Sequence, residues 1–349
     1  MFLAFIERRN ADALAGPMFR RPFRLALPVS LALAFTSIMT VSGAFKYANE
    51  VSNSLANKSA AEPLIWESTI TYFNSCVGYL MDFSLMKNTR GSAFLRPANI
   101  GWIIPIIFQQ TFCISVIAFM LPFVILRWKV LGGILFGLAA WWSGRWVWYS
   151  TFSILLAEFS VVYLPLMPET WTLNLYGKRN IQVGQKVIPL FILSLGVLLK
   201  YLWTIFPTHL NDELVAHVDP TSGNLMWNPD PLTATPRVDD FFIVSSSLLF
   251  LEISPLLRKG LDQKWLKLLG SLAFSSFLTS GTVMLAVGSV LRHHLISRLH
   301  WTSDSPLVLF VLFLSCVPSA LIFSLIWKMI VDDGSLSIAR YLYKWFTVE

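Results

Sequence analysis

The sequence predicts an all-α protein, a polytopic transmembrane helix bundle of about eight spans, with a range of roughly seven to ten. Three observations support this prediction. Of the 349 residues, 55% are hydrophobic and only 13% are charged, whereas soluble domains carry about a quarter charged residues. The apolar residues form runs of membrane-spanning length, and basic and acidic residues alternate between the ends of these runs. We therefore expect one integral membrane domain over residues 1–349.

A helix needs about 20 apolar residues to cross the hydrocarbon core of a bilayer. The runs that approach this length are Leu25–Phe45, Trp102–Leu126, Val130–Gly144, Trp146–Met167, Val187–Phe206, Phe241–Leu257, Lys267–Leu291 and Leu307–Val331. The third run is short, and only Arg145 separates it from the fourth. These two runs could instead form one bent, re-entrant unit, which is why the span count has a range.

The charges predict an orientation. With the N-terminus in the cytosol, alternation places most basic clusters on the cytosolic side and the acidic loop 207–240 on the lumenal side, as the positive-inside rule requires. Both termini then lie in the cytosol. We expect the membrane to be the endoplasmic reticulum or another endomembrane. The exception is the basic segment Arg292–Arg298, which falls on the far side. Because the basic residues flank apolar runs, the net charge of +7 does not indicate nucleic-acid binding.

Residues 46–101 are expected to form an extramembrane or interfacial segment. Within them, Leu64–Leu85 mixes polar and aromatic residues, which is typical of an amphipathic helix lying in the membrane interface. The charge alternation holds only if this helix does not span the bilayer.

Two carboxylates, Glu158 and Glu252, lie inside apolar runs and are candidate catalytic residues. An ionised group at the centre of a bilayer costs about 2.5 kcal/mol or more on insertion scales, so each carboxylate must face a wet cavity, pair with a cation or be protonated. Lys200 is a candidate partner, and Ser245 lies seven residues before Glu252 on the same helical face. Structural pairing and chemistry both remain open.

Arg21 and Arg24 precede the first apolar run and are three residues apart, so on a helix they share one face. A guanidinium group binds phosphate through two parallel hydrogen bonds, which makes the two arginines a candidate cofactor-binding site. The alternative is that they set topology or contact anionic lipid head groups.

The histidines offer a third candidate, because a carboxylate that orients a histidine makes a general base. His294 with Asp304, or His209 with Asp212, could form such a pair. The alternative is that all five histidines are plain interfacial residues.

Other polar residues in the apolar runs suggest structure rather than chemistry. Gln109 and Gln110 are expected to hydrogen-bond neighbouring helices, as amides in bilayers do. Cys76, Cys113 and Cys316 are far apart and lack metal-ligand spacing, so we expect no metal site.

Several segments resemble, in the same order, motifs of the fungal branch of the acyltransferase 3 family. These are integral membrane proteins that move acyl groups from acyl-CoA to sugars or small metabolites. The segment Met18–Pro28, with the sequence MFRRPFRLALP, is similar to the family's entry to a membrane helix. Weaker similarities follow at Gly101–Pro105, Gly144–Glu158, Leu268–Phe274 and Val331–Arg340.

This resemblance implies that Arg21 and Arg24 bind the acyl donor, acyl-CoA. The chain departs from the family in its catalytic residues, because the histidine usually assigned to catalysis is missing and Thr279-Ser280 replace a second histidine. Glu158 or Glu252 would then supply or orient the base, with His294 as the histidine candidate.

Three functions remain as hypotheses for a protein whose expected partners are membrane lipids and a lipophilic small molecule. The first is transfer of an acyl group from acyl-CoA to a hydroxyl of a lipophilic secondary metabolite. The second is a cofactor-free cyclase, isomerase or hydrolase of a terpenoid or polyketide. The third is a non-catalytic accessory protein, scaffold or transporter.

Overall fold

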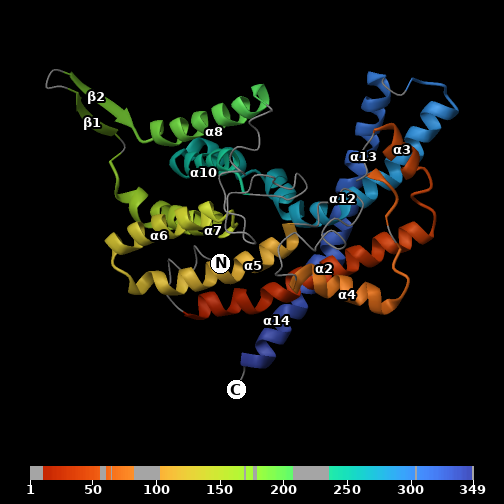
Figure 1. The fold of residues 1–349 in the computed structure, drawn as a ribbon, viewed down its shortest axis with the longest axis horizontal. Helices are drawn as coiled ribbons and strands as arrows, with labels where there is room; N and C mark the ends of the chain where they lie inside the picture. The colour runs from red at the N-terminus through yellow and green to blue at the C-terminus, as the bar shows by residue number, and fades with distance from the viewer. Residues whose placement is uncertain are drawn as a thin grey trace. The chain divides into compact units, whose positions relative to one another are not determined.

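The computed structural model describes residues 11–55, 60–63, 65–81, 103–168, 170–175, 179–206, 236–302 and 305–347, and the predicted all-α fold class is confirmed (Figure 1). The helices are α2 (Ala11–Val41), α3 (Ala48–Ser54), α4 (Thr69–Met81), α5 (Ile103–Met120), α6 (Leu126–Trp142), α7 (Val147–Glu158), α8 (Val187–Ile205), α10 (Val238–Ile253), α11 (Pro255–Leu261), α12 (Lys264–Ser297), α13 (Pro306–Trp327) and α14 (Asp333–Thr347). Short 3-10 turns are η3 (Leu121–Phe123) and η5 (Leu164–Leu166), and π-helical turns are η4 (Phe159–Tyr163) and η7 (Lys328–Asp332).

One feature was not predicted: a small antiparallel hairpin between α7 and α8. It joins β1 (Thr170–Leu175) to β2 (Arg179–Gly184), with Thr170 opposite Gly184 and Leu175 opposite Arg179. From the sequence, this stretch was expected only to connect two apolar runs.

Six helices of the described residues are long and apolar enough to cross a membrane, or seven if α10 and α11 are one broken span. All eight predicted runs are helical, but α6 has only 17 residues and is not among the six. α10 and α11 meet at an angle of 102° where Pro255 follows Ser254, because the proline ring disfavours helical backbone in the residue before it. Among the described residues, the candidate spans thus number six or seven, and the upper figure meets the lower end of the predicted range.

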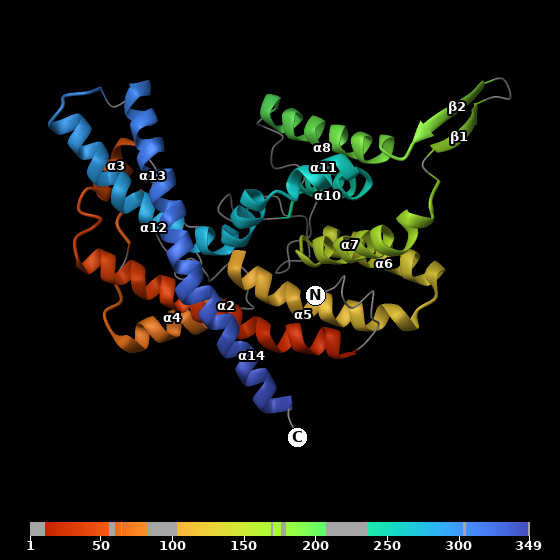
Figure 2. The ribbon, with the colours of Figure 1, turned by 180° about the vertical axis from the view of Figure 1, so that it is seen from behind.

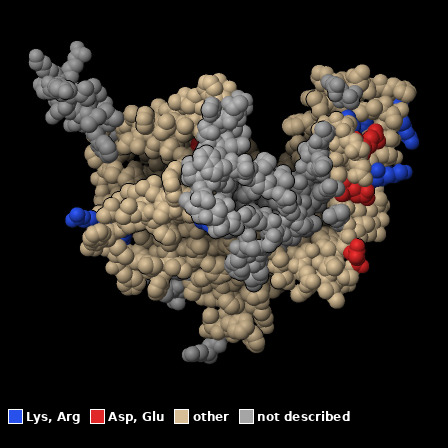
Figure 3. Space-filling view, in the orientation of Figure 1, with Lys and Arg blue, Asp and Glu red and all other residues tan. Residues whose placement is uncertain are grey.

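The helices present apolar side chains to their surroundings. On α8, Phe191 is 66% exposed, and on α13, Phe313 is 63% exposed. On the face drawn in Figure 3, charged side chains are few and wide areas carry none. Apolar surface of this extent is typical of contact with lipid, so membrane lipids are partners of this chain.

The contacts divide the chain into two compact units. Unit 1 comprises Met1–Pro17 and Gln110–Lys264, and unit 2 comprises Met18–Gln109 and Trp265–Glu349. The single membrane domain over residues 1–349 stays a prediction. Residues 207–235 of the predicted acidic loop lie outside the described residues.

In unit 1, α6 and α7 form a helical hairpin whose turn contains Gly144 at a φ of 63° (Figures 1 and 2). Gly133 and Gly137, one helical turn apart, allow α7 to lie close to α6. A Cβ atom on Gly133 would lie 2.7 Å from Leu155, and one on Gly137 would lie 2.7 Å from the ring of Phe152. Small residues at this spacing are the usual means of close helix packing in membranes.

The helices α8 and α10 also approach closely. Gly196 on α8 is buried, and a Cβ atom there would lie 3.0 Å from the backbone nitrogen of Ile243 on α10. In both helix pairs, glycine replaces a side chain where a second helix must fit. These two contacts set the spacing of the four helices that build the candidate site.

Unit 2 is held together by small hydroxyl side chains on one face of α12. Thr282 on this face shares a 2.9 Å hydrogen bond with Thr36 of α2, and Thr279 lies 3.3 Å from Ser324 of α13. Both pairs are buried. Hydroxyl groups of this kind allow close approach and also bond across helix interfaces.

The predicted helix within Leu64–Leu85 is present as α4. The 13 described residues of α4 are not among the candidate spans, and its place in the membrane interface stays a prediction. The Tyr72 hydroxyl donates to the Ser30 carbonyl of α2 at 2.6 Å. Burial first, and then a hydrogen bond with Cys76, raises the pKa of Tyr72 above its ordinary value.

We expect Gly137→Ala to be about 1–3 kcal/mol less stable than a matched glycine-to-alanine control, because the new methyl group overlaps the Phe152 ring and forces a shift in a packed interior. The control is Gly132→Ala, since no atom lies within 4 Å of a Cβ there. Both substitutions raise helix propensity by about 1 kcal/mol, so they differ only in the contact. Thermal unfolding in nanodiscs measures both variants, and equal melting temperatures would contradict this prediction.

Candidate functional site

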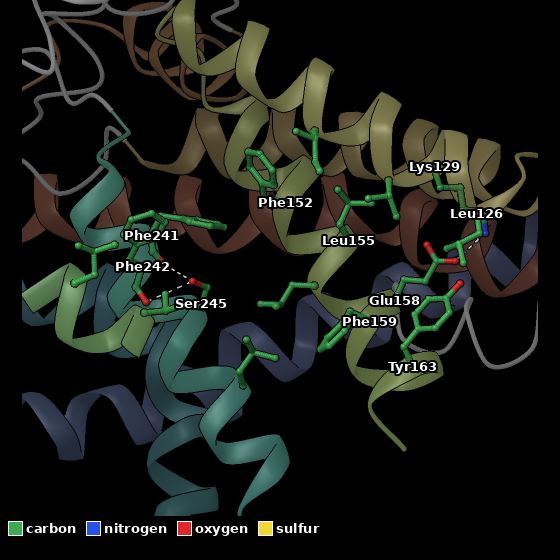
Figure 4. Close-up of a pocket in the computed structure, with 16 residues that line it drawn as sticks. Leu126, Lys129, Phe152, Leu155, Glu158, Phe159, Tyr163, Phe241, Phe242 and Ser245 are labelled. Atoms are coloured by element: carbon green, nitrogen blue, oxygen red, sulfur yellow. Dashed lines mark hydrogen bonds and ion pairs between the residues drawn. The ribbon is translucent and has the colours of Figure 1, made fainter. Parts of the chain in front are cut away.

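Unit 1 contains a pocket of about 430 Å³ between α6, α7, η4, α8 and α10 (Figure 4). Its lining is apolar except for four side chains, and most of it is aliphatic or phenylalanine. The lining residues are Leu126, Lys129, Val130, Ile134, Phe152, Leu155, Leu156, Glu158, Phe159, Tyr163, Ile192, Leu195, Phe241, Phe242, Ser245 and Leu249. A concave apolar site with few polar groups is typical of small-molecule binding.

An ion pair lies at one end of the pocket. The Lys129 Nζ atom donates to Glu158 Oε1 at 2.7 Å, and each side chain is only 12% exposed. Lys129 is in the first turn of α6 and Glu158 is the last residue of α7, so the hairpin brings the two together. Each charge compensates part of the desolvation cost of the other in this apolar setting.

The polar groups of the pocket are separated along its length. Figure 4 shows Lys129, Glu158 and Tyr163 near one another at one end, and Phe241, Phe242 and Ser245 at the other. Ser245 donates to the Phe241 carbonyl at 2.6 Å, so its hydroxyl proton is already used within α10. The Ser245 oxygen can still accept a hydrogen bond, but only the end with the ion pair offers charged groups to a ligand.

A π-helical turn shapes this polar end. The turn η4 begins directly after Glu158 and ends at Tyr163, and both Phe159 and Tyr163 line the pocket. One turn of π-helix adds a residue to the helix and changes the direction of the side chains that follow, and such turns occur often at functional sites. Tyr163 was not predicted as a site residue, because no sequence pattern indicates a π-turn.

The mouth of the pocket lies on the apolar surface of the helices. On α6, Leu126 is 48%, Val130 is 46% and Ile134 is 40% exposed, and Leu195 on α8 is 36% exposed. These are lining residues that also face outward, so the pocket opens between α6 and α8.

The opposite end is closed by aromatic packing and a network of charges. The ring of Phe241 lies 5.1 Å from that of Trp148 and 6.0 Å from that of Phe152. In the same part of unit 1, the fully buried carboxylate of Asp239 pairs with Arg237 at 3.2 Å. The Tyr149 hydroxyl donates to the Arg237 carbonyl at 2.6 Å.

The proposed partner of the intramembrane carboxylates was wrong. Lys200 pairs with Asp240 at 2.7 Å and with Asp239 at 3.5 Å, not with Glu158 or Glu252. Lys200 lies near the C-terminal end of α8, and Asp239 and Asp240 begin α10. The antiparallel pairing of these two helices brings them together, which the sequence does not reveal.

The two candidate glutamates occupy different environments. Glu158 lines the pocket, whereas Glu252 does not. The side chain of Glu252 is 51% exposed and forms a 2.7 Å ion pair with Arg258, across the bend between α10 and α11. Ser245 lines the pocket and Glu252 does not, so these two residues do not form one polar stripe on α10. The structure thus singles out Glu158.

The two arginines lie in α2, which puts them in unit 2. Arg24 is exposed, and Arg21 is half-buried. The Nε atom of Arg21 is buried and makes no hydrogen bond to any residue that the structure describes. Next to them, the Arg20 guanidinium lies 5.9 Å from the ring centre of Tyr343 on α14, so this basic part of α2 packs against α14.

His294 is exposed near the end of α12, and its suggested partner Asp304 lies outside the described residues. The neighbouring His293 is instead paired, because its Nδ1 atom lies 2.9 Å from Glu50 Oε2 and its ring stacks on Tyr47 at 3.8 Å. No sequence pattern indicates this pair, since 243 residues separate its members. His209 and Asp212 also lie outside the described residues.

The structural interpretation of Gln110 is confirmed. Its Oε1 atom accepts a 2.7 Å hydrogen bond from Ser150 of α7, which joins α5 to α7. Cys76, Cys113 and Cys316 are not joined in disulfides. Across the described ranges, no three His, Cys, Asp or Glu side chains are grouped as metal ligands.

We expect the Lys129–Glu158 pair to show a coupling energy of about 1–3 kcal/mol, the size found for residues in direct contact. Lys129→Met alone and Glu158→Leu alone each leave one charge in an apolar pocket, whereas the double variant leaves none. Unfolding in detergent micelles measures the cycle. The double variant should be more stable than the sum of the single losses predicts, and additive losses would contradict the pairing.

Comparison with protein-family models, with curated proteins and with solved structures finds no match to this chain. The resemblance to the acyltransferase 3 family therefore depends on the sequence motifs alone.

Proposed function

We propose that this membrane protein takes up a lipophilic small molecule from the bilayer into the pocket of unit 1 and acts on a polar group of that molecule at Glu158. The observation that carries this proposal is the position of the buried Lys129–Glu158 pair at one end of a pocket that is otherwise nearly apolar. The apolar walls would bind the body of the ligand, and the ion pair would fix its orientation. The mouth between α6 and α8 supports entry from the lipid.

The reaction we propose is transfer of an acyl group from acyl-CoA to a hydroxyl of the bound molecule. Lys129 bonds Oε1 of Glu158, and a ligand hydroxyl would donate to Oε2. Glu158 would accept the hydroxyl proton as general base, while the hydroxyl oxygen attacks the thioester carbonyl. The ester forms, the carbon–sulfur bond breaks, and the CoA thiolate leaves with the proton.

Support for acyl-CoA as the donor comes from the motif Met18–Pro28 and from the chemistry of its arginines. Arg21 and Arg24 would bind the phosphates of CoA, because guanidinium groups pair well with phosphate. The two arginines lie in unit 2 and Glu158 lies in unit 1. Phosphate binding by the arginines and the base role of Glu158 therefore need separate tests. We also propose that the protein lies in the membrane of the endoplasmic reticulum. The charge alternation supports an orientation with both termini in the cytosol.

The test is a comparison of lipid-soluble metabolites in cells that lack the gene and in the same cells carrying wild type, Glu158→Gln or Glu252→Gln. We expect a metabolite lighter by one acyl group to accumulate without the gene and with Glu158→Gln. Glu252→Gln should restore the wild-type profile. Glu252 is a matched control, since it also forms a 2.7 Å ion pair but is half-exposed and outside the pocket.

Other outcomes would redirect the assignment. Accumulation of an isomer of equal mass, with conversion that needs no CoA, would replace acyl transfer by the cyclase or isomerase hypothesis. A profile that does not change on deletion would contradict an enzymatic role. If both glutamate variants lost activity equally while remaining folded, the pocket would not be the site.

A further inference from the structure

The short helix α11 leaves α10 at a nearly right-angled corner in unit 1. The two helices meet at 102°, and the break lies at Ser254, whose backbone is extended with a φ of −104° and a ψ of 102°. Arg258 spans the corner, because its Nη2 atom donates to the carboxylate and to the backbone carbonyl of Glu252, each at 2.7 Å. The angle is therefore supported by hydrogen bonds on both sides of the break.

The corner lies level with the start of α8. The two helices α8 and α10 are antiparallel neighbours, and Gly196 of α8 faces the backbone of Ile243 of α10. From this contact, α10 continues for ten residues to Ile253, and α8 reaches back over nine residues to Val187. A helix rises about 1.5 Å per residue, so the end of α10 and the start of α8 lie at about the same distance from the contact.

This level is a membrane boundary. The helix α8 is one of the candidate spans, and it begins directly after Lys186, which is exposed. Basic residues flank spans at the interface with water. Spanning helices tilt by about 20° on average from the membrane normal, so a helix at 102° to α10, the neighbour of α8, runs nearly parallel to the membrane surface. The helix α11 thus lies along the boundary.

The side chains of α11 divide into two faces. All seven of its residues are exposed. Leu257 and Leu261 are four residues apart and lie beside Leu256 on one side of the helix, and Leu256 is 81% exposed. Arg258 and Lys259 project from the opposite side. A helix with a leucine face and a basic face is typical of the membrane interface, where the apolar face is buried about 5–10 Å deep.

Positive charge prevails around the corner. The basic residues here are Lys186, Arg258, Lys259 and Lys264, and the acidic residues are Glu252 and Asp262. Glu252 is already paired with Arg258, whereas the three lysines form no ion pair with any residue that the structure describes. Charge alternation predicts that this side is cytosolic, where anionic lipids attract basic residues close to the membrane.

We propose that α11 lies in the plane of the membrane interface and binds the anionic phospholipids of that leaflet. Its leucine face contacts the acyl chains, and Lys259 and Lys264 bind headgroup phosphates. The occupant is a lipid leaflet because the 102° corner lays the leucine face along the membrane boundary and because the lysines there lack carboxylate partners. This inference is independent of the proposed reaction.

The first measurement determines the depth of α11 in nanodiscs that contain phosphatidylcholine and phosphatidylserine. A nitroxide label is attached to Leu256→Cys or to Lys259→Cys in the full chain, with Cys76, Cys113 and Cys316 replaced by alanine. We expect the label at the leucine position to be relaxed mainly by oxygen, which concentrates in lipid, and the label at the lysine position mainly by a water-soluble nickel complex. Water exposure of both labels would overturn the proposal. Shielding of the first label from both reagents would also overturn it, because a protein would then cover this face.

The second measurement tests the preference for anionic lipid. Native mass spectrometry counts the lipids retained by the protein from nanodiscs with equal amounts of phosphatidylserine and phosphatidylcholine. Each lysine close to an anionic surface favours binding by about fivefold, so we expect the wild type to retain phosphatidylserine over phosphatidylcholine by about fivefold or more. A Lys259→Gln, Lys264→Gln double variant should retain the two lipids almost equally, whereas Lys259→Arg with Lys264→Arg should keep the preference.

A matched control separates α11 from the general charge of the protein. Lys46→Gln removes one exposed lysine in unit 2 and should leave the preference for phosphatidylserine within about twofold of the wild-type value. Equal retention of both lipids by the wild type would overturn the proposal. A loss in Lys46→Gln as large as that in the α11 double variant would overturn it as well, because the preference would then come from net charge and not from this helix.

Discussion

Within the hydrocarbon of a bilayer there is no water to satisfy a polar group, so each such group needs a partner inside the protein. This constraint accounts for the ion pair of Lys129 with Glu158 and for the bond from Ser150 to Gln110. It also accounts for the hydroxyl pairs of α12 with α2 and α13.

Satisfying these groups requires helices that lie close together, and glycine makes this possible. Gly133 and Gly137 bring α6 against α7, which places the first turn of one helix beside the last turn of the other. Gly196 does the same for α8 and α10. The pocket is the space left where these two close pairs do not fill the interior, and its polar end is a consequence of the α6–α7 hairpin.

The two glutamates of the apolar runs differ in burial, and this difference changes what their ion pairs contribute. Glu158 and Glu252 both form ion pairs of 2.7 Å, but the side chain of Glu158 is 12% exposed and that of Glu252 is 51% exposed. An exposed pair contributes little because solvent screens it, whereas a buried pair in an apolar pocket sets where a polar ligand group can go. The sequence alone does not distinguish Glu158 from Glu252, because both lie inside apolar runs. Their different burial in the structure distinguishes them.

The sequence by itself determined that this chain is a helical membrane protein, because composition and the length of apolar runs depend only on local order along the chain. It also identified Glu158 as a charged residue inside an apolar run, and Arg21 and Arg24 as charged residues just before one. Only the tertiary structure decided the partners of these residues. Lys129 meets Glu158, Glu50 meets His293, and Ser275 meets Asp332 through helix packing across 29, 243 and 57 positions. The π-turn that orients Tyr163 likewise has no sequence signature, because tertiary contacts stabilise it and not local propensity.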